Sequence, residues 1–139
     1  MIKKIDHIAV AVDNLDEAIA MYRDVLGLEF HGVEEVAGQK VKVAFFKVGE
    51  MHIELTAPTS EDSPAAKFIA KRGAGIHHIA FEVDDISAQA ADFESKGVRM
   101  IDREPKIGAG GAKIVFAHPK SFAGVLFELK EPRQAEESE

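Results

Sequence analysis

One pattern occurs twice in this chain, and the repetition limits how the chain can fold. Residues 5–14 read Ile-Asp-His-Ile-Ala-Val-Ala-Val-Asp-Asn, and residues 75–85 read Gly-Ile-His-His-Ile-Ala-Phe-Glu-Val-Asp-Asp. Each copy places a histidine, His7 or His78, before an alternating run that is typical of a strand, and closes with a pair suited to capping a helix. The two histidines lie 71 positions apart. We therefore expect two similar halves.

A second repeated motif follows each copy. Residues 53–58 read Ile-Glu-Leu-Thr-Ala-Pro and residues 127–132 read Phe-Glu-Leu-Lys-Glu-Pro, with Glu54 and Glu128 74 positions apart. A histidine and a glutamate thus occupy equivalent places in both halves of the chain.

Composition excludes several classes of protein. The chain has 139 residues, of which 46% are hydrophobic and 29% charged, as in one soluble globular domain. No apolar run approaches the length of a membrane span, and no signal peptide precedes the first strand, so we expect a cytoplasmic protein. The net charge of −7 argues against nucleic-acid binding. Without cysteine, any bound metal must use histidine and oxygen ligands.

The spacing of apolar residues, together with the residues that begin and end helices, predicts the order βαβββ in each half. Strands are expected over 2–12, 28–36, 40–48 and 51–57 in the first half, and over 76–83, 98–104, 112–118 and 123–130 in the second. The first helix begins at Asp13 or Asn14 and ends at Gly27, and its apolar stripe consists of Leu15, Ile19, Tyr22 and Leu26. The second helix is expected over 86–96.

These elements predict an α+β fold: two pseudo-symmetric βαβββ modules whose curled mixed sheets form one metal-containing cleft. The modules cover about 1–59 and 74–132 of a single domain, 1–132, and a helix over about 63–73 links them. Ser63 caps this linking helix and Pro64 takes its first position. Residues 133–139 form an acidic tail that is predicted to be disordered.

Strand phase indicates a site made from the repeated residues. A lone histidine on a strand is usually structural, but here histidine and glutamate recur together and alternate away from the branched core side. A buried glutamate is costly unless it is paired or bound to a metal. Two imidazoles and two carboxylates suit a divalent ion of borderline hardness and leave two positions of an octahedral shell open. The predicted ligands are His7, Glu54, His78 and Glu128.

These residues also carry a family resemblance. Over residues 4–131 the chain resembles the vicinal oxygen chelate (glyoxalase/bleomycin resistance/dioxygenase) superfamily and, within it, the methylmalonyl-CoA epimerase family. The His/Glu skeleton alone points only to the superfamily, whereas the Gly-rich turn and the His-Pro-Lys-Ser loop point to the epimerases. The matching segments are 6–10, 54–55, 62–64, 75–80, 105–111, 118–121 and 124–129.

The resemblance implies an isomerase of propionate metabolism that interconverts (2R)- and (2S)-methylmalonyl-CoA. It implies one divalent metal ion per chain, Co²⁺ first, with Mn²⁺, Ni²⁺, Zn²⁺, Fe²⁺ or Mg²⁺ as alternatives, held by the four residues named above and stabilising an enolate. Some members have glutamine at the position of Glu54. Glu128 is in addition a candidate acid/base group. The family further implies a homodimer.

Epimerisation needs a second acid/base group, which some family members place on the central strand of the first half. Aligned there is Lys42, whose phase predicts that it faces the cleft. Equally open are a lysine at the cleft rim that attracts coenzyme A phosphates and one that extends to solvent. Lys120 and Ser121 are candidate substrate-binding residues, with an ordinary polar loop as the alternative. His77, of opposite phase to His78, is expected to be structural.

Three other functions are compatible with parts of this pattern. A glyoxalase-type lyase or isomerase shares the ligand skeleton, although the turn and loop segments favour the epimerase. A metal-free, drug-sequestering protein of the same fold needs no complete ligand set. A ring-cleaving dioxygenase needs only three protein ligands, so the fourth carboxylate argues against it.

Overall fold

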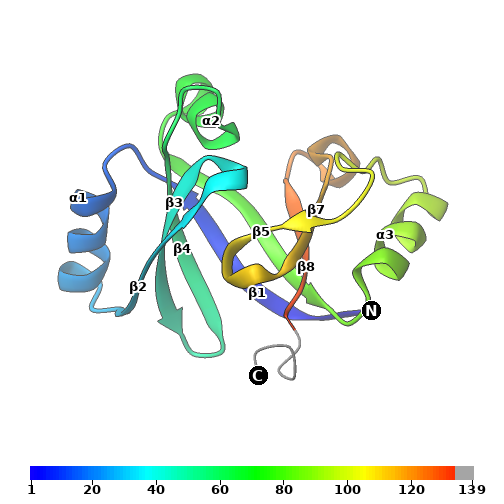
Figure 1. Ribbon diagram of the computed structural model, residues 1–139, viewed down its shortest axis with the longest axis horizontal. Coiled ribbons are helices and arrows are strands. Elements are labelled where there is room, and N and C mark those ends of the chain that lie inside the picture. The colour runs from blue at the N-terminus through cyan, green and yellow to red at the C-terminus, as the bar shows by residue number, and fades with distance from the viewer. Residues whose placement is uncertain (134–139) are drawn as a thin grey trace. The chain divides into compact units, whose positions relative to one another are not determined.

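A computed structural model describes residues 1–133 of the chain (Figure 1), so that all but the first residue of the predicted tail lies outside the described residues. The chain divides into two compact units. The N-terminal unit is His7–His77, and the C-terminal unit is Met1–Asp6 together with the chain from His78 onward. This division differs from the expected modules, because the boundary between the two units falls within the first strand, between Asp6 and His7. The single-domain interpretation stays a prediction.

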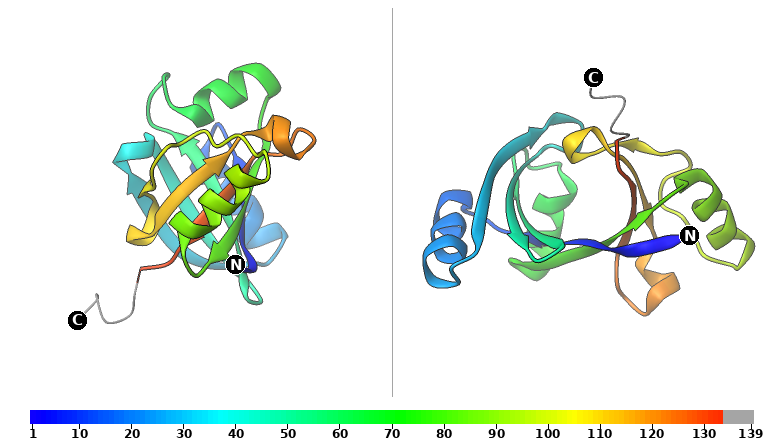
Figure 2. Two further views of the ribbon diagram at one scale, coloured as in Figure 1. Left: turned by 90° about the vertical axis from the view of Figure 1, so that its right-hand side faces the viewer. Right: turned by 90° about the horizontal axis from the view of Figure 1, so that it is seen from below.

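The N-terminal unit contains the predicted βαβββ order. Its sheet has the strand order β2-β3-β4-β1, with β1 and β4 parallel and the other pairs antiparallel. In the right-hand view of Figure 2, α1 lies on the outer, convex side of the curved strands β2–β4. The elements are β1 (Ile2–Ala11), α1 (Leu15–Ala20), the π-helical η1 (Met21–Val25), β2 (Glu29–Val36), the 3₁₀ turn η2 (Ala37–Gln39), β3 (Val41–Val48), β4 (Met51–Pro58) and α2 (Pro64–Arg72).

The core of this unit lies between the sheet and α1. Phe46 and Leu55 are fully buried there, and Ile19 and Tyr22 pack against them from the helix side. The prediction that Leu26 completes the helix stripe is wrong, because its side chain is 59% exposed. The cause is the last turn, where the Leu26 N–H donates to the Met21 carbonyl five residues back, at 3.1 Å. A π turn is wider than an α turn, so it rotates the next side chain off the apolar stripe.

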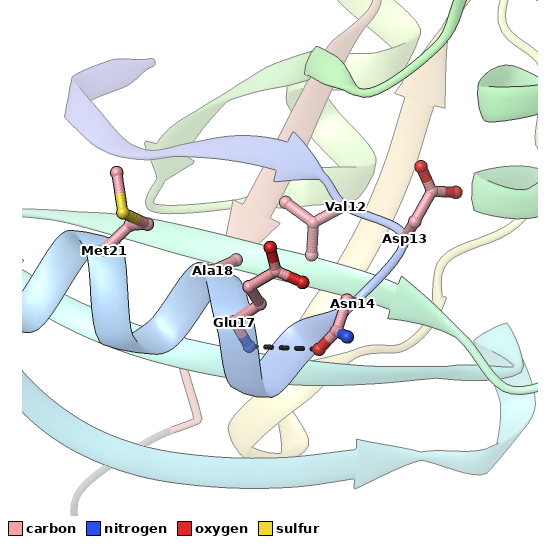
Figure 3. Close-up of a pocket in the computed structure, with 6 residues that line it drawn as sticks. All are labelled: Val12, Asp13, Asn14, Glu17, Ala18 and Met21. Atoms are coloured by element: carbon pink, nitrogen blue, oxygen red, sulfur yellow. Dashed lines mark hydrogen bonds between the residues drawn. The ribbon is translucent and has the colours of Figure 1, made fainter.

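A shallow hollow lies beside the start of α1 (Figure 3). Its lining consists of Val12, Asp13, Asn14, Glu17, Ala18 and Met21. Of the two predicted capping candidates, Asn14 is the one that caps: its side-chain oxygen accepts the Glu17 N–H at 3.0 Å. The hollow contains none of the predicted site residues.

The linking helix α2 begins as predicted, with Ser63 accepting the Ala66 N–H at 3.0 Å and Pro64 at the first position. Just before it, Asp62 accepts hydrogen bonds from the Lys40 ammonium and the Ser60 hydroxyl. These two hydrogen bonds, the one from Lys40 first, lower the pKa of Asp62 from 3.8 to about 2. Lys40 itself adopts a left-handed conformation with φ of 57°.

This pKa shift predicts a pH dependence of stability. Because the folded pKa lies below the unfolded value of 3.8, the stabilising contribution is complete above pH 3.8 and disappears as the pH falls towards 2. The difference in free energy of unfolding between wild type and Asp62→Asn should therefore shrink steadily from pH 4 to pH 2. Urea unfolding at several pH values measures it. A difference that grows or stays constant over this range would contradict the assignment to Asp62.

The C-terminal unit repeats the order with shorter strands. Its elements are β5 (Gly75–Val83), which enters it at His78, α3 (Ile86–Ser95), β6 (Lys106–Ile107), the 3₁₀ turn η3 (Ala109–Gly111), β7 (Lys113–Ala117), the 3₁₀ turn η4 (Pro119–Phe122) and β8 (Phe127–Glu131). The strand order is β5-β8-β7-β6, with β5 and β8 parallel and the other pairs antiparallel. The α+β class with two βαβββ modules is thus confirmed.

The core of the C-terminal unit lies between this sheet and α3, and its buried members are Val83, Ile86, Val115 and Leu129. Asp85 caps α3 by accepting the Ala88 N–H at 3.0 Å. Glu131, far along the chain, accepts the Ile86 N–H at 3.0 Å. The first turn of α3 is therefore tied to the end of β8.

The predicted strand over 98–104 is wrong. Only the bridge of Met100 with Ala117 forms there, followed by the two-residue β6. The Ile101 N–H still reaches the Phe116 carbonyl at 2.8 Å, but the Phe116 N–H is taken by the Asp102 carboxylate at 2.9 Å. A side chain that captures a backbone donor in this way competes with the strand ladder and ends it.

The Gly-rich turn before β7 needs its glycines. A Cβ added at Gly108 would lie 2.9 Å from the Ile114 side chain, which is closer than packing allows. Gly110 and Gly111 have φ of 69° and 76°, a region that other residues rarely adopt. The turn is thus a tight connection that positions β7. No helix among residues 1–133 is long and apolar enough to cross a membrane.

Candidate functional site

The N-terminal unit holds one buried histidine–glutamate pair. His7 Nδ1 lies 3.2 Å from Glu54 Oε2, and the residues are only 4% and 7% exposed. Parallel pairing of β1 with β4 places Ala9 beside Glu54, two residues after His7. Glu54 alternates with the core residues Ile53 and Leu55, so it points to the opposite face of the sheet from α1.

The C-terminal unit holds the matching pair. His78 Nε2 lies 3.2 Å from Glu128 Oε1, and the residues are 9% and 5% exposed. Here β5 and β8 are parallel and Ala80 lies beside Glu128, again two residues after the histidine. Because the strand register is the same in both units, the sequence repeat is also a repeat of geometry.

The two pairs differ in the nitrogen that faces the carboxylate. It is Nδ1 in His7 and Nε2 in His78. The two nitrogens sit at different distances from the backbone, so the two imidazole rings must be oriented differently in their units. A sequence repeat specifies the residue type but not which ring atom is presented.

The donor set fits a divalent metal ion. Each unit presents one imidazole nitrogen and one carboxylate oxygen in a buried setting, and these are the ligand types preferred by ions of borderline hardness. Burial of a carboxylate is costly unless a charge, a hydrogen-bond donor or a metal accompanies it. Both pairs therefore have the chemistry of half a metal site.

Comparisons with known proteins show the family of the chain. The family model of the glyoxalase/bleomycin resistance protein/dioxygenase superfamily matches residues 6–116. The ethylmalonyl-CoA/methylmalonyl-CoA epimerase of Cereibacter sphaeroides is 42% identical over 133 residues, which cover 94% of this chain and 99% of the relative. The chain belongs to the methylmalonyl-CoA epimerase family of this superfamily.

Solved structures of epimerases of this family are similar over their whole length. A crystal structure of methylmalonyl-CoA epimerase from Mycobacterium tuberculosis has a TM-score of 0.94 and 36% identity, and the match covers 99% of this chain and 93% of that one. A variant of the Streptomyces coelicolor epimerase in complex with 2-nitronate-propionyl-CoA has a TM-score of 0.92 and 40% identity, with 96% and 100% covered.

In this member of the epimerase family Lys42 does not have the orientation predicted from the sequence. Lys42 lies opposite Ala57 in the β3–β4 ladder, and its side chain points to the opposite face of the sheet from that of the next residue, Val43. Ala57 belongs to the core on the α1 side, so Lys42 lies on the face opposite to Glu54, where it is exposed. The prediction of its face is wrong because the alternation of β3 was assigned to the wrong side. The residues of β3 beside Glu54 and Thr56 are Phe45 and Val43.

The His-Pro-Lys-Ser loop of the epimerase family forms η4, between β7 and β8. The Ser121 hydroxyl accepts the Arg99 N–H at 3.0 Å, and His118 Nδ1 accepts the Lys120 N–H at 3.0 Å. Both Lys120 and Ser121 are exposed. The loop is thus folded by its own side chains, and its role in substrate binding stays a prediction.

Two further histidines lie near the predicted ligands in sequence. The His77 ring packs edge-on against Phe68 of α2, with centroids 5.0 Å apart, in agreement with a structural role. His52 has the same strand phase as Glu54, and its ring lies 6.4 Å from that of His31.

Sequence reasoning missed a charged pair next to the ligands. Lys130 Nζ donates to Asp6 Oδ2 at 2.9 Å, and the side chains are 21% and 10% exposed. Asp6 precedes His7, and Lys130 follows Glu128 by two residues on the same strand face. A lysine in phase with a predicted ligand was the signal that could have shown it.

Proposed function

We propose that this protein is a metal-dependent epimerase that interconverts (2R)- and (2S)-methylmalonyl-CoA by removing and returning the C2 proton through an enolate. The observation that carries the proposal is the pair of buried histidine–glutamate contacts, which occur at the same register in both units. The similarity to epimerases over almost the whole chain supports the choice of substrate.

The proposed metal ligands are His7, Glu54, His78 and Glu128, acting together on one divalent ion. Co²⁺ is the first candidate, and Mn²⁺, Ni²⁺, Zn²⁺, Fe²⁺ and Mg²⁺ are alternatives, since a set of two nitrogens and two oxygens does not select one ion. When bound, such an ion supplies Lewis-acid stabilisation of negative charge that develops on the substrate oxygens.

Glu128 is the proposed acceptor of the C2 proton as well as a ligand. The C2–H bond breaks, the proton passes to a carboxylate oxygen, and the electron pair stays in the substrate as the enolate. A proton from solvent water adds to the opposite face of C2 and forms the new C–H bond, Glu128 releases the first proton to solvent, and no carbon–carbon or carbon–sulfur bond changes. Because Phe45 and Val43 occupy the β3 positions beside Glu54 and Thr56, those positions supply no titrating group. Lys42 is therefore left out of the proposed proton transfer.

The remaining parts of the proposal rest on the family. Lys120 and Ser121 are proposed to bind the substrate, and the protein is proposed to be a cytoplasmic homodimer. Sedimentation of the metal-loaded protein at micromolar concentration tests the dimer, and a monomer would refute it.

The function is tested by proton exchange. Purified protein loaded with Co²⁺ and incubated with methylmalonyl-CoA in heavy water should replace the C2 hydrogen with deuterium, without cleavage of the substrate. Glu54→Gln keeps an oxygen ligand of the same length, so it should retain exchange and change mainly the preference among metal ions. Mass spectrometry and NMR of the substrate measure the deuterium at C2 for wild type and for Glu54→Gln, with each metal ion in turn. Asp16→Asn, on the first turn of α1, serves as a control that removes one negative charge far along the chain from Glu54.

Two outcomes would refute the proposal. If the metal-loaded protein leaves the C2 hydrogen of methylmalonyl-CoA unexchanged, the epimerase assignment fails. If the protein instead isomerises a glutathione hemithioacetal, the glyoxalase-type alternative takes its place.

A further inference from the structure

We propose that Asp102, Lys106 and Phe116 form a brace that fixes the orientation of the His78 imidazole, and so act as positioning residues for the candidate metal site. All of them lie in the C-terminal unit. The effect on metal binding rests on the function proposed above, whereas the effect on the His78 ring does not.

The first contact is between rings. The Phe116 ring meets the His78 ring edge to face, with centroids 5.2 Å apart and an interplanar angle of 84°. Phe116 lies directly across from Glu128 in the β7–β8 ladder, so it shares a sheet face with the carboxylate that His78 contacts. The ring is therefore placed to limit how far the imidazole can swing from the orientation in which Nε2 lies 3.2 Å from Glu128.

The second contact holds Phe116 itself. Lys106 Nζ lies over the Phe116 ring, 5.1 Å from its centroid, within the range of a cation–π interaction. Lys106 shares this sheet face, because it lies opposite Ile114 in the β6–β7 ladder, two residues before Phe116. The ammonium thus covers the ring that contacts His78.

Asp102 ties both parts together. One carboxylate oxygen accepts the Lys106 ammonium at 3.0 Å, and the other accepts the Phe116 backbone N–H at 2.9 Å. Its side chain is only 17% exposed, compared with 38% for Lys106. A single carboxylate therefore sets the position of the Phe116 backbone and of the cation over its ring. Some residues contact a metal ligand, but not the metal, and fix the orientation of that ligand. Removing such a residue typically weakens metal binding by about 10–100-fold.

The test compares two lysine–aspartate pairs with the same sequence spacing. Lys106→Met removes the cation of the brace, and Lys96→Met removes the ammonium that pairs with Asp92 at 2.9 Å on the surface of α3. Titration calorimetry with Co²⁺ should show about 10-fold weaker binding for Lys106→Met, Asp102→Asn and Phe116→Leu. Lys96→Met should bind like wild type. Thermal unfolding of the metal-free proteins shows that each variant is folded.

A second measurement needs no metal. In the metal-free protein the ring protons of His78, assigned with a His78→Gln variant, should carry a ring-current shift from Phe116. That shift should vanish in Phe116→Leu, change in Lys106→Met and Asp102→Asn, and persist in Lys96→Met. If Lys106→Met and Asp102→Asn leave the His78 resonances unchanged, the brace is refuted. It is also refuted if Lys96→Met weakens Co²⁺ binding as much as Lys106→Met does. If wild type binds no Co²⁺ while the resonances behave as expected, the proposed function fails and the brace stands.

Discussion

Replacing Glu128 by alanine is expected to abolish C2 proton exchange in methylmalonyl-CoA. The substitution removes the carboxylate that lies 3.2 Å from His78, and Glu128 is buried, with 5% of the residue exposed. Loss of a general acid–base group alone lowers turnover by about 10²–10⁴-fold, and loss of a proposed ligand adds to this effect. Deuterium incorporation measured with excess Co²⁺ checks the result, and Glu94→Ala on the exposed surface of α3 is the control.

Glu128→Gln separates the two roles assigned to this residue. Glutamine keeps a carbonyl oxygen that can bind a metal but does not accept a proton at neutral pH. We expect this variant to bind Co²⁺ and to exchange no C2 proton. Retained exchange in Glu128→Gln would make Glu128 a ligand only, and retained exchange in Glu128→Ala would remove it from the site.

Among the variants proposed for stability measurements, replacing Lys130 by methionine is expected to lower the free energy of unfolding the most. Methionine keeps most of the aliphatic stem but removes the ammonium that binds Asp6 at 2.9 Å, and the Asp6 side chain is 10% exposed. Removal of one partner from a buried ion pair typically costs about 3–5 kcal/mol, and we expect a value of about 3 kcal/mol here because Lys130 is 21% exposed. Urea unfolding at pH 7 measures the change.

The double variant Asp6→Asn/Lys130→Met tests the cause. With both charges gone, most of the loss should be recovered, because neutral side chains of similar shape carry little desolvation cost. The surface pair of Lys96 and Asp92, with side chains 69% and 45% exposed, is the matched control, and Lys96→Met should cost less than about 1 kcal/mol. A Lys130→Met variant as stable as Lys96→Met would show that the Asp6 pair contributes little.

Most of the fold was predicted from the repeat in the sequence. Alternation around His7 and His78 predicted both strands and the face of each histidine, because the side-chain period of a strand is a local property. Glu54 and Glu128 were predicted to join both histidines in one metal site, because histidine and glutamate recur at nearly the same spacing in the two halves. The structure shows each histidine in contact with the glutamate of its own unit, and the common site of all four residues stays a prediction.

The errors arose where a local pattern was decided by distant atoms. Alternation on β3 is real, but the side on which Lys42 lies is set by the packing of α1 against Ala44 and Phe46. Leu26 had helical spacing, but a π turn changed the angle per residue. The strand expected from residue 98 ended early because the carboxylate of Asp102 captured a backbone donor of β7.

The division of the chain also has a consequence for its synthesis. The N-terminal unit, His7–His77, is one continuous segment, so all the residues that form its internal contacts have been made before the C-terminal unit is complete. The C-terminal unit also needs Met1–Asp6, which precede the N-terminal unit in the chain, so Asp6 can bind Lys130 only after the rest of the chain has been made. Closing so long a loop slows folding more than it destabilises the product. Variants of Asp6 should therefore impair a late step in the folding of newly made chains, after the N-terminal unit has formed.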